Sequence, residues 1–288
     1  MTISAMAAGQ SRSYLWSPLT LGFCAMALPT IYTLATETWG QEDAAHGPLI
    51  ICSGLWLLWR QLPEFTSAEA QGEPWIVALA LAISLPIYIF GEGFDFVTLA
   101  AMGLYATGVT ILYSASGIKV IARNWFIFVY LLFAVPPPRS WLDSITFPLK
   151  QFASSAATVM LQPLGIPVAH EGVVIYVAQY QYLVEDACSG LNSIVGLLAI
   201  GLLYIHLVRR GSWRYSLLLA GLTIPIAILA NILRIAILIL LTVFLGDGVA
   251  QGYMHFAAGI VVFVLALLLI MSMDFLFVLV RSWRHKTI

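Results

Sequence analysis

The sequence has few charged residues. Asp, Glu, Lys and Arg make up 9% of its 288 residues, hydrophobic residues make up 61%, and the mean hydropathy is +0.93. A soluble domain usually has about 25% charged residues, so this composition excludes an ordinary soluble protein. The apolar stretches do not alternate as the strands of a membrane barrel would, and an all-α polytopic membrane protein is therefore predicted.

Cysteines are also scarce. The three, Cys24, Cys52 and Cys188, do not stand at a spacing typical of metal ligands, so neither a zinc site nor a disulfide framework is predicted. We expect no metal and no cofactor. No cleavable signal peptide is expected before the first apolar stretch, because the segment 1–16 is short and polar. The net charge of -1 says nothing about partners, and no nucleic acid is expected among them.

About eight membrane spans are predicted. A helix needs roughly 20 apolar residues to cross the hydrocarbon layer, and Gly and Pro punctuate the joins between such stretches. The predicted spans are 17–36, 47–62, 74–91, 95–116, 119–137, 188–208, 213–241 and 254–280. We expect one integral membrane domain over residues 1–288.

Basic residues predict the orientation of these spans. Lys and Arg accumulate in short cytoplasmic loops, and ten of the thirteen fall on one side when both termini are cytoplasmic. The ten are Arg12, Arg60, Lys119, Arg123, Arg209, Arg210, Arg214, Arg281, Arg284 and Lys286. The long segment 138–187 is then extracytoplasmic, in a protein of the inner (cytoplasmic) membrane.

This segment predicts a cap with two parts. Apolar residues recur at helical spacing after three prolines, as in a helix that lies in the membrane interface; they are Ile145, Leu149, Phe152, Ala156, Val159 and Met160. Residues 174–184 then alternate as in a short β-hairpin, and 166–172 could supply a third strand. The cap either covers the bundle or offers a strand edge to an extended peptide, in which case Tyr180, Tyr182 and Glu185 are candidate substrate-binding residues.

Cys188 follows this cap directly and begins an apolar stretch. The amino end of a helix carries partial positive charge, which favours a thiolate over a thiol, and the thiolate is the nucleophile. A buried structural thiol is the alternative from position alone. Ser189 and Asn192 stand beside Cys188 and are candidate supporting residues.

Two further polar residues are predicted at the same membrane level. Arg234 lies late in the seventh predicted span, where an arginine costs about 2.5–3.5 kcal/mol on insertion scales, and Asn231 precedes it by one helical turn. His255 starts the eighth span. Cys188 could attack a peptide carbonyl, His255 could transfer the proton, and Arg234 could stabilise the oxyanion, with Asn231 in support.

At these residues the sequence resembles the exosortase and archaeosortase family of integral membrane cysteine proteases or transpeptidases. The resemblance lies in three motifs: Ala187-Cys188-Ser189-Gly190, Asn231-Ile232-Leu233-Arg234-Ile235, and His255 followed by Gly259. It implies a catalytic set of Cys188, Arg234 and His255. It also implies exported protein substrates with a C-terminal sorting signal. In this signal a short motif, often Pro-Glu-Pro, precedes one membrane span and a basic tail. Such substrates are often linked with exopolysaccharide.

Two other classes of function stay open. In a transporter or channel, Arg234 and Asn231 would line a path, but the ionisable residues gather at one face instead of the midplane. In a non-enzymatic assembly factor for exopolysaccharide, the cap would be a docking surface. For the enzyme, the acyl group would pass to water or to another nucleophile, such as a lipid or a glycan.

Overall fold

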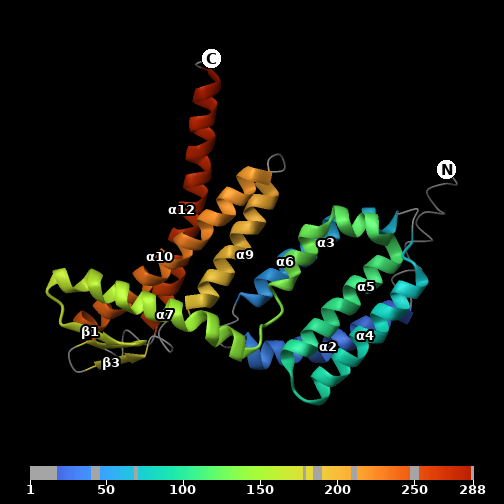
Figure 1. Cartoon of the computed structure of the whole chain (residues 1–288), viewed down its shortest axis with the longest axis horizontal. Coiled ribbons are helices and arrows are strands. Elements are labelled where there is room, and N and C mark those ends of the chain that lie inside the picture. The colour runs from blue at the N-terminus through green and yellow to red at the C-terminus, as the bar shows by residue number, and fades with distance from the viewer. Residues whose placement is uncertain are drawn as a thin grey trace. The chain divides into compact units, whose positions relative to one another are not determined.

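A computed structural model describes residues 18–39, 46–67, 71–177, 180–183, 190–208, 213–246 and 253–286 (Figure 1). The chain divides into two compact units, Met1–Pro138 and Arg139–Ile288, which are described separately below. The prediction of a single membrane domain stays a prediction.

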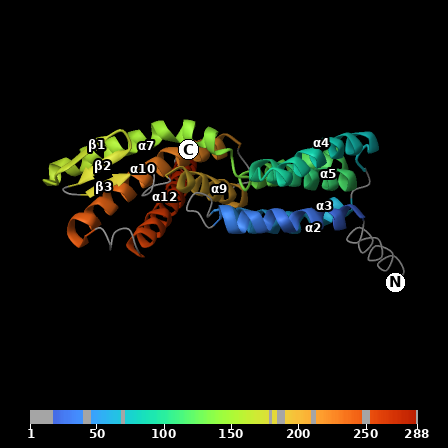
Figure 2. The ribbon, with the colours of Figure 1, turned by 90° about the horizontal axis from the view of Figure 1, so that it is seen from below.

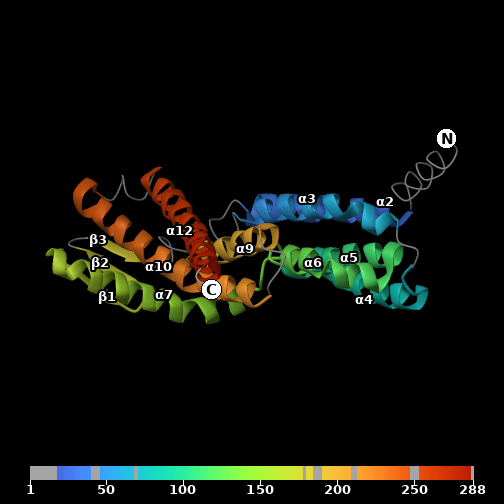
Figure 3. The same cartoon turned by 90° about the horizontal axis from the view of Figure 1, so that it is seen from above.

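The first unit is helical. Its elements are α2 (Pro18–Thr33), the π-helical η1 (Leu34–Thr38), α3 (Gly47–Thr66), α4 (Pro74–Gly93), α5 (Val97–Arg123) and α6 (Trp125–Leu132). Figures 2 and 3 show α2 and α3 in one layer and α4 and α5 in another. A hydrogen bond of 2.7 Å from the Thr30 hydroxyl to the Glu92 carboxylate joins α2 to α4.

Small residues allow α4 and α5 to pack closely. A Cβ atom on Gly103 of α5 would lie 2.6 Å from the backbone nitrogen of Tyr88 in α4, a distance too short for any side chain. Lipid tails are as apolar as leucine, so helices in a membrane associate through such close packing and through buried hydrogen bonds. Thr107 supplies one, donating to the Ser84 hydroxyl at 3.0 Å.

Gly117 separates the fourth and fifth predicted spans. Its φ of 70° and ψ of 174° interrupt α5, and a side chain is disfavoured in that conformation. The short α6 then follows Asn124, so the fifth predicted span, 119–137, is helical in two pieces. The predicted join at residue 117 is confirmed, but the uninterrupted helix after it is not present.

The second unit combines helices with a small sheet. Its elements are α7 (Arg139–Leu161), the 3-10 turn η3 (Gln162–Leu164), β1 (Val168–Glu171), β2 (Val174–Val177), β3 (Tyr180–Leu183), α9 (Gly190–Val208), α10 (Trp213–Leu245) and α12 (Tyr253–Lys286). In Figures 1 and 2 the sheet lies beside α7 and α10. Helix α10 packs against α7, α9 and α12, and thus forms the centre of the unit.

Helix α7 confirms the amphipathic helix predicted from its periodicity. Its small residues Ala153 and Ala157 are buried and share a core cluster with α10. Phe152 and Val159 on the other face are 58% and 63% exposed. An amphipathic helix with exposed aromatic and branched residues suits a membrane interface, as the sequence predicts.

The predicted strands form a three-stranded antiparallel sheet in the order β1-β2-β3. Val168 pairs with Val177, and Ile175 pairs with Tyr182. Val168, Ile175 and Val177 are buried in one core cluster with Ile235 of α10 and other residues of α7, α10 and α12. The sheet is therefore packed onto the helices by one face.

The described residues contain five helices long and apolar enough to cross a membrane. These are Pro18–Thr38, Pro74–Gly93, Val97–Arg123, Leu217–Leu245 and Ala257–Phe277. Among the same described residues, α9 contributes a shorter apolar helix, Val195–Val208, and α3 carries Arg60 and Glu64 in its second half. A helical multi-pass membrane protein is confirmed, whereas the count of eight spans is not.

Candidate functional site

Arg234 is a buried cation in α10. Only 8% of its surface is exposed, although it lies within the membrane-spanning segment Leu217–Leu245. Asn231, one helical turn earlier, is 4% exposed. Charged groups within a membrane segment are costly and usually functional, so this pair is the natural starting point for a site.

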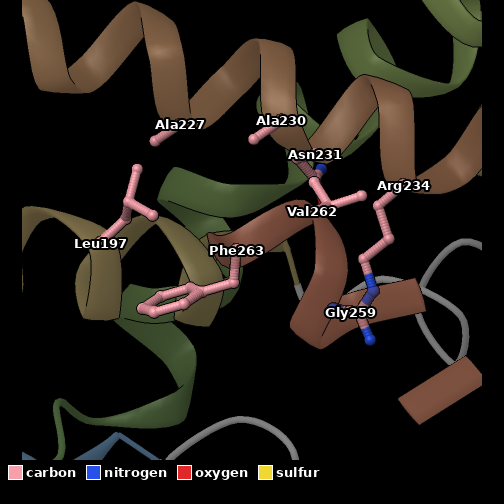
Figure 4. A pocket seen from close by; sticks show the side chains of 8 residues that line it. All are labelled: Leu197, Ala227, Ala230, Asn231, Arg234, Gly259, Val262 and Phe263. Atoms are coloured by element: carbon pink, nitrogen blue, oxygen red, sulfur yellow. The ribbon is translucent and has the colours of Figure 1, made fainter. Parts of the chain in front are cut away.

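The guanidinium of Arg234 lies against Gly259 of α12. A Cβ atom at position 259 would come within 3.3 Å of Cζ and of Nη2, and within 3.4 Å of Nε. Figure 4 shows the arginine side chain extending from α10 to Gly259. The missing side chain of Gly259 thus makes room for the guanidinium beside the backbone of α12.

His255 lies one turn before Gly259 in the first turn of α12. Residues four apart share a face of a helix, so positions 255 and 259 both belong to the face that meets α10. Along the axis they are about 6 Å apart. The side chain of His255 is outside what the structure describes.

Helix α9 brings its amino end to the same level. It runs antiparallel to α10, because Leu197 clusters with Ala227 while Gly201, further along α9, contacts Thr223. Gly190 precedes Leu197 by about 10 Å of helix, and Arg234 follows Ala227 by about the same distance. The start of α9 therefore lies level with Arg234.

The predicted nucleophile precedes this helix closely in the sequence. Cys188 and Ser189 lie immediately before Gly190, the first residue of α9, and both are outside the described residues. Asn192 is in the first turn of α9, but its side chain is not described either. The catalytic and supporting roles of these residues stay predictions.

The candidate substrate-binding residues belong to or follow β3. Tyr182 pairs with Ile175 and Tyr180 pairs with Val177, and directly opposed residues of an antiparallel pair lie on the same face of a sheet. Positions 180 and 182 thus share a sheet face with Ile175 and Val177, and the side chains of both tyrosines are outside what the structure describes. Glu185 is outside the described residues.

A small cavity of about 20 Å³ lies where α9, α10 and α12 meet (Figure 4). Its walls are mainly apolar, with Asn231 and Arg234 as the polar members. The lining residues are Leu197, Ala227, Ala230, Asn231, Arg234, Gly259, Val262 and Phe263. The cavity is thus a neighbour of the guanidinium and is built by all three helices.

A family model described as transmembrane exosortase matches residues 39–272. This is most of the chain, and it includes α9, α10 and the part of α12 up to residue 272. The chain belongs to the transmembrane exosortase family. No curated protein and no solved structure matches it.

Membership of the exosortase family bears on function as well as architecture. It indicates a multi-pass membrane protein related to the sorting of exported proteins, and the family consists in general of proteases or transpeptidases. The matched segment contains Arg234, Gly259 and the helix ends beside them.

This exosortase-family chain also has a polar cluster that sequence analysis missed. Asp274 of α12 is 4% exposed, and its carboxylate accepts hydrogen bonds from Tyr204 of α9 at 2.8 Å and from Tyr215 of α10 at 2.5 Å. It lies about 22 Å along α12 from Gly259. The signal available was a lone acid in an apolar stretch, but its two partners are far away in sequence.

Proposed function

We propose that this chain is a membrane-embedded cysteine protease or transpeptidase that cleaves the C-terminal sorting signal of exported proteins. The observation that carries the proposal is the buried Arg234 guanidinium, which lies level with the start of α9 and against Gly259, itself one helical turn after His255. Family membership supports the same class of activity. The proposed residues are Cys188, which precedes α9 in the sequence, Arg234 of α10 and His255 of α12.

The first half-reaction forms a thioester. The Cys188 thiolate attacks the scissile carbonyl carbon, and the resulting oxyanion accepts hydrogen bonds from the Arg234 guanidinium. The carbon–nitrogen bond then breaks, and the His255 imidazolium gives its proton to the departing amine. The released product is the C-terminal tail with a free amino group.

The second half-reaction frees the enzyme. Water or a hydroxyl or amino group of an acceptor attacks the thioester, neutral His255 takes its proton, and the cysteine thiolate leaves. Water gives hydrolysis, whereas an acceptor such as a lipid or a glycan gives transpeptidation or transfer. No metal or cofactor takes part in this scheme.

We place the site on the extracytoplasmic face of the inner membrane, with both termini in the cytoplasm and eight crossings. The asymmetry of Lys and Arg along the sequence supports this orientation. The substrate's short recognition motif would then meet the cap formed by α7 and the sheet. Its span would lie in the bilayer, and its basic tail would reach the cytoplasm.

Loss of the tail from a co-expressed substrate tests this function. Membranes that contain the chain and an exported protein ending in a Pro-Glu-Pro motif, a span and a basic tail should release the tail. Cys188→Ala should abolish release, whereas Cys52→Ala, a matched change at an exposed cysteine of α3, should preserve it. Release by Cys188→Ala, or failure of wild-type chain with every such substrate tried, would refute the proposal.

A further inference from the structure

Asn231 has a buried oxygen whose hydrogen-bond donor is not among the described residues. The side chain is 4% exposed, and its Oδ1 accepts no hydrogen bond from any residue the structure describes. A buried acceptor left unsatisfied costs about 1–3 kcal/mol, and most buried polar atoms have a partner in the protein or in ordered water. A donor for Oδ1 is therefore expected nearby.

The cavity beside Asn231 has the size of one water site. Its volume is about 20 Å³, and an internal water needs at least about 10–15 Å³ measured in this way. Most of its walls, including Leu197, Val262 and Phe263, have no side-chain donor to offer. A water molecule is small enough to enter this cavity and donate a hydrogen bond to Asn231 Oδ1, whereas a larger polar molecule would not fit.

Arg234 gives such a water its second partner. It lines the same cavity and stands three residues after Asn231, so the two side chains are neighbours on one face of α10. A guanidinium has five N–H donors and no acceptor, while an amide oxygen is an acceptor only. A molecule between them must donate to one and accept from the other, as water does.

We infer that one water molecule occupies this cavity, donates to Asn231 Oδ1 and accepts from the Arg234 guanidinium. Asn231 is thereby a positioning residue that holds the guanidinium through water, with the backbone of Gly259 against it. The water site itself does not depend on the proposed function. The consequence for catalysis does, because it requires Arg234 to act on the substrate.

Nuclear magnetic resonance of the full chain in nanodiscs tests the water directly. With ¹⁵N-labelled arginine, the side-chain N–H signals of Arg234 are assigned by their loss in Arg234→Lys. We expect a nuclear Overhauser cross-peak from these protons to water, separated from chemical exchange by comparison with a rotating-frame spectrum. The absence of this cross-peak in the wild-type chain would overturn the inference.

Four variants test where the water is held. Asn231→Leu removes the acceptor with similar branching, and Ala230→Val narrows the cavity while keeping the amide, so both should lose the cross-peak. Asn231→Asp keeps an acceptor and should retain it. Leu229→Val, at a position 50% exposed and outside the cavity lining, is the matched control and should also retain it. Persistence of the cross-peak in both Asn231→Leu and Ala230→Val would overturn the site.

The rate of tail release tests the positioning role. Asn231→Leu should lower kcat about tenfold or more with KM unchanged, as expected for a lost charge-assisted hydrogen bond, and Asn231→Asp should restore much of it. A rise in KM alone would overturn the positioning role. A wild-type chain that releases no tail would refute the proposed function, while the water cross-peak would still decide the site.

Discussion

The guanidinium of Arg234 in α10 packs against the backbone of Gly259 in α12. Because a methyl group at position 259 would lie 3.3 Å from Cζ of Arg234, the guanidinium would have to move by a few tenths of an ångström to accept it. Small displacements of a catalytic group are costly when its hydrogen bonds are directional. The glycine thus sets where the cation lies.

Gly259→Ala is expected to lower the rate of tail release about tenfold without lowering stability. Alanine favours helix over glycine by about 0.8–1.0 kcal/mol in water, so a loss of activity would come from the displaced guanidinium and not from unfolding. Gly221→Ala is the matched control, because α10 leaves open space around that position. Equal activity in both variants would show that the contact does not position Arg234.

Asp274 is expected to hold α9, α10 and α12 together at the end away from Arg234. Asp274→Ala would remove the acceptor that the part-buried hydroxyls of Tyr204 and Tyr215 share, and a typical intramolecular hydrogen bond contributes about 0.5–1.5 kcal/mol. We expect a clearly lower midpoint of thermal unfolding in detergent, and a smaller decrease in Tyr204→Phe or Tyr215→Phe. An unchanged midpoint in Asp274→Ala would contradict this role.

His46, just before α3, is expected to make stability depend on pH. Burial lowers the pKa of this imidazole below 6.5, so the folded chain binds a proton less readily than the unfolded chain. Its contribution is therefore complete above pH 6.5 and is lost as pH falls toward the folded pKa. Thermal midpoints at pH 7.5 and 5.5 should differ less in His46→Gln than in wild type, and an identical difference would exclude His46.

Sequence periodicity predicted the local structure of the second unit well. The repeat of apolar residues in α7 marks an exposed apolar face that includes Phe152 and Val159, whereas the alternation in 174–184 marks a face turned toward a core. Local sequence can encode both patterns. Gly117 was also readable, because a glycine between two apolar stretches marks a turn. Predictions at this scale need only the spacing of apolar residues.

Contacts between helices were not readable in the same way. Gly259 could be recognised as part of a motif, but its contact with Arg234 depends on how closely α10 and α12 approach. The Asp274 cluster joins residues 59 and 70 positions apart. Likewise, the fifth predicted span, 119–137, was expected to be one helix, yet the backbone turns at Asn124. Such features depend on tertiary packing, which apolar spacing does not specify.

The orientation of the chain is expected to place α7 outside the cytoplasm. Positive charge is retained on the cytoplasmic side, and most Lys and Arg residues fall there when the cap is outside. Compartment-reporting fusions at Lys150 should read extracytoplasmic, and fusions at Gly211 and at the C-terminus should read cytoplasmic. A cytoplasmic reading at Lys150 would invert the site and remove it from exported substrates.

Arg234→Lys best separates catalysis from charge complementarity. Lysine keeps the positive charge but loses the planar fork of N–H donors, so an oxyanion would lose directed hydrogen bonds while the site keeps its charge. We expect tail release to fall about 10²–10³-fold, the range seen when one oxyanion donor is removed. Substrate capture by Cys188→Ala and by Cys188→Ala combined with Arg234→Lys should be equal.

The same assay carries its own test of a shared site. If Arg234 and His255 act in one reaction, combining Arg234→Lys with His255→Ala should cost much less than the product of the two single losses. The rate must be normalised to the amount of folded protein, with Cys188→Ala as the floor. Full activity in Arg234→Lys would reduce the arginine to a fixed charge, and full activity in Arg234→Ala would remove it from the catalytic site.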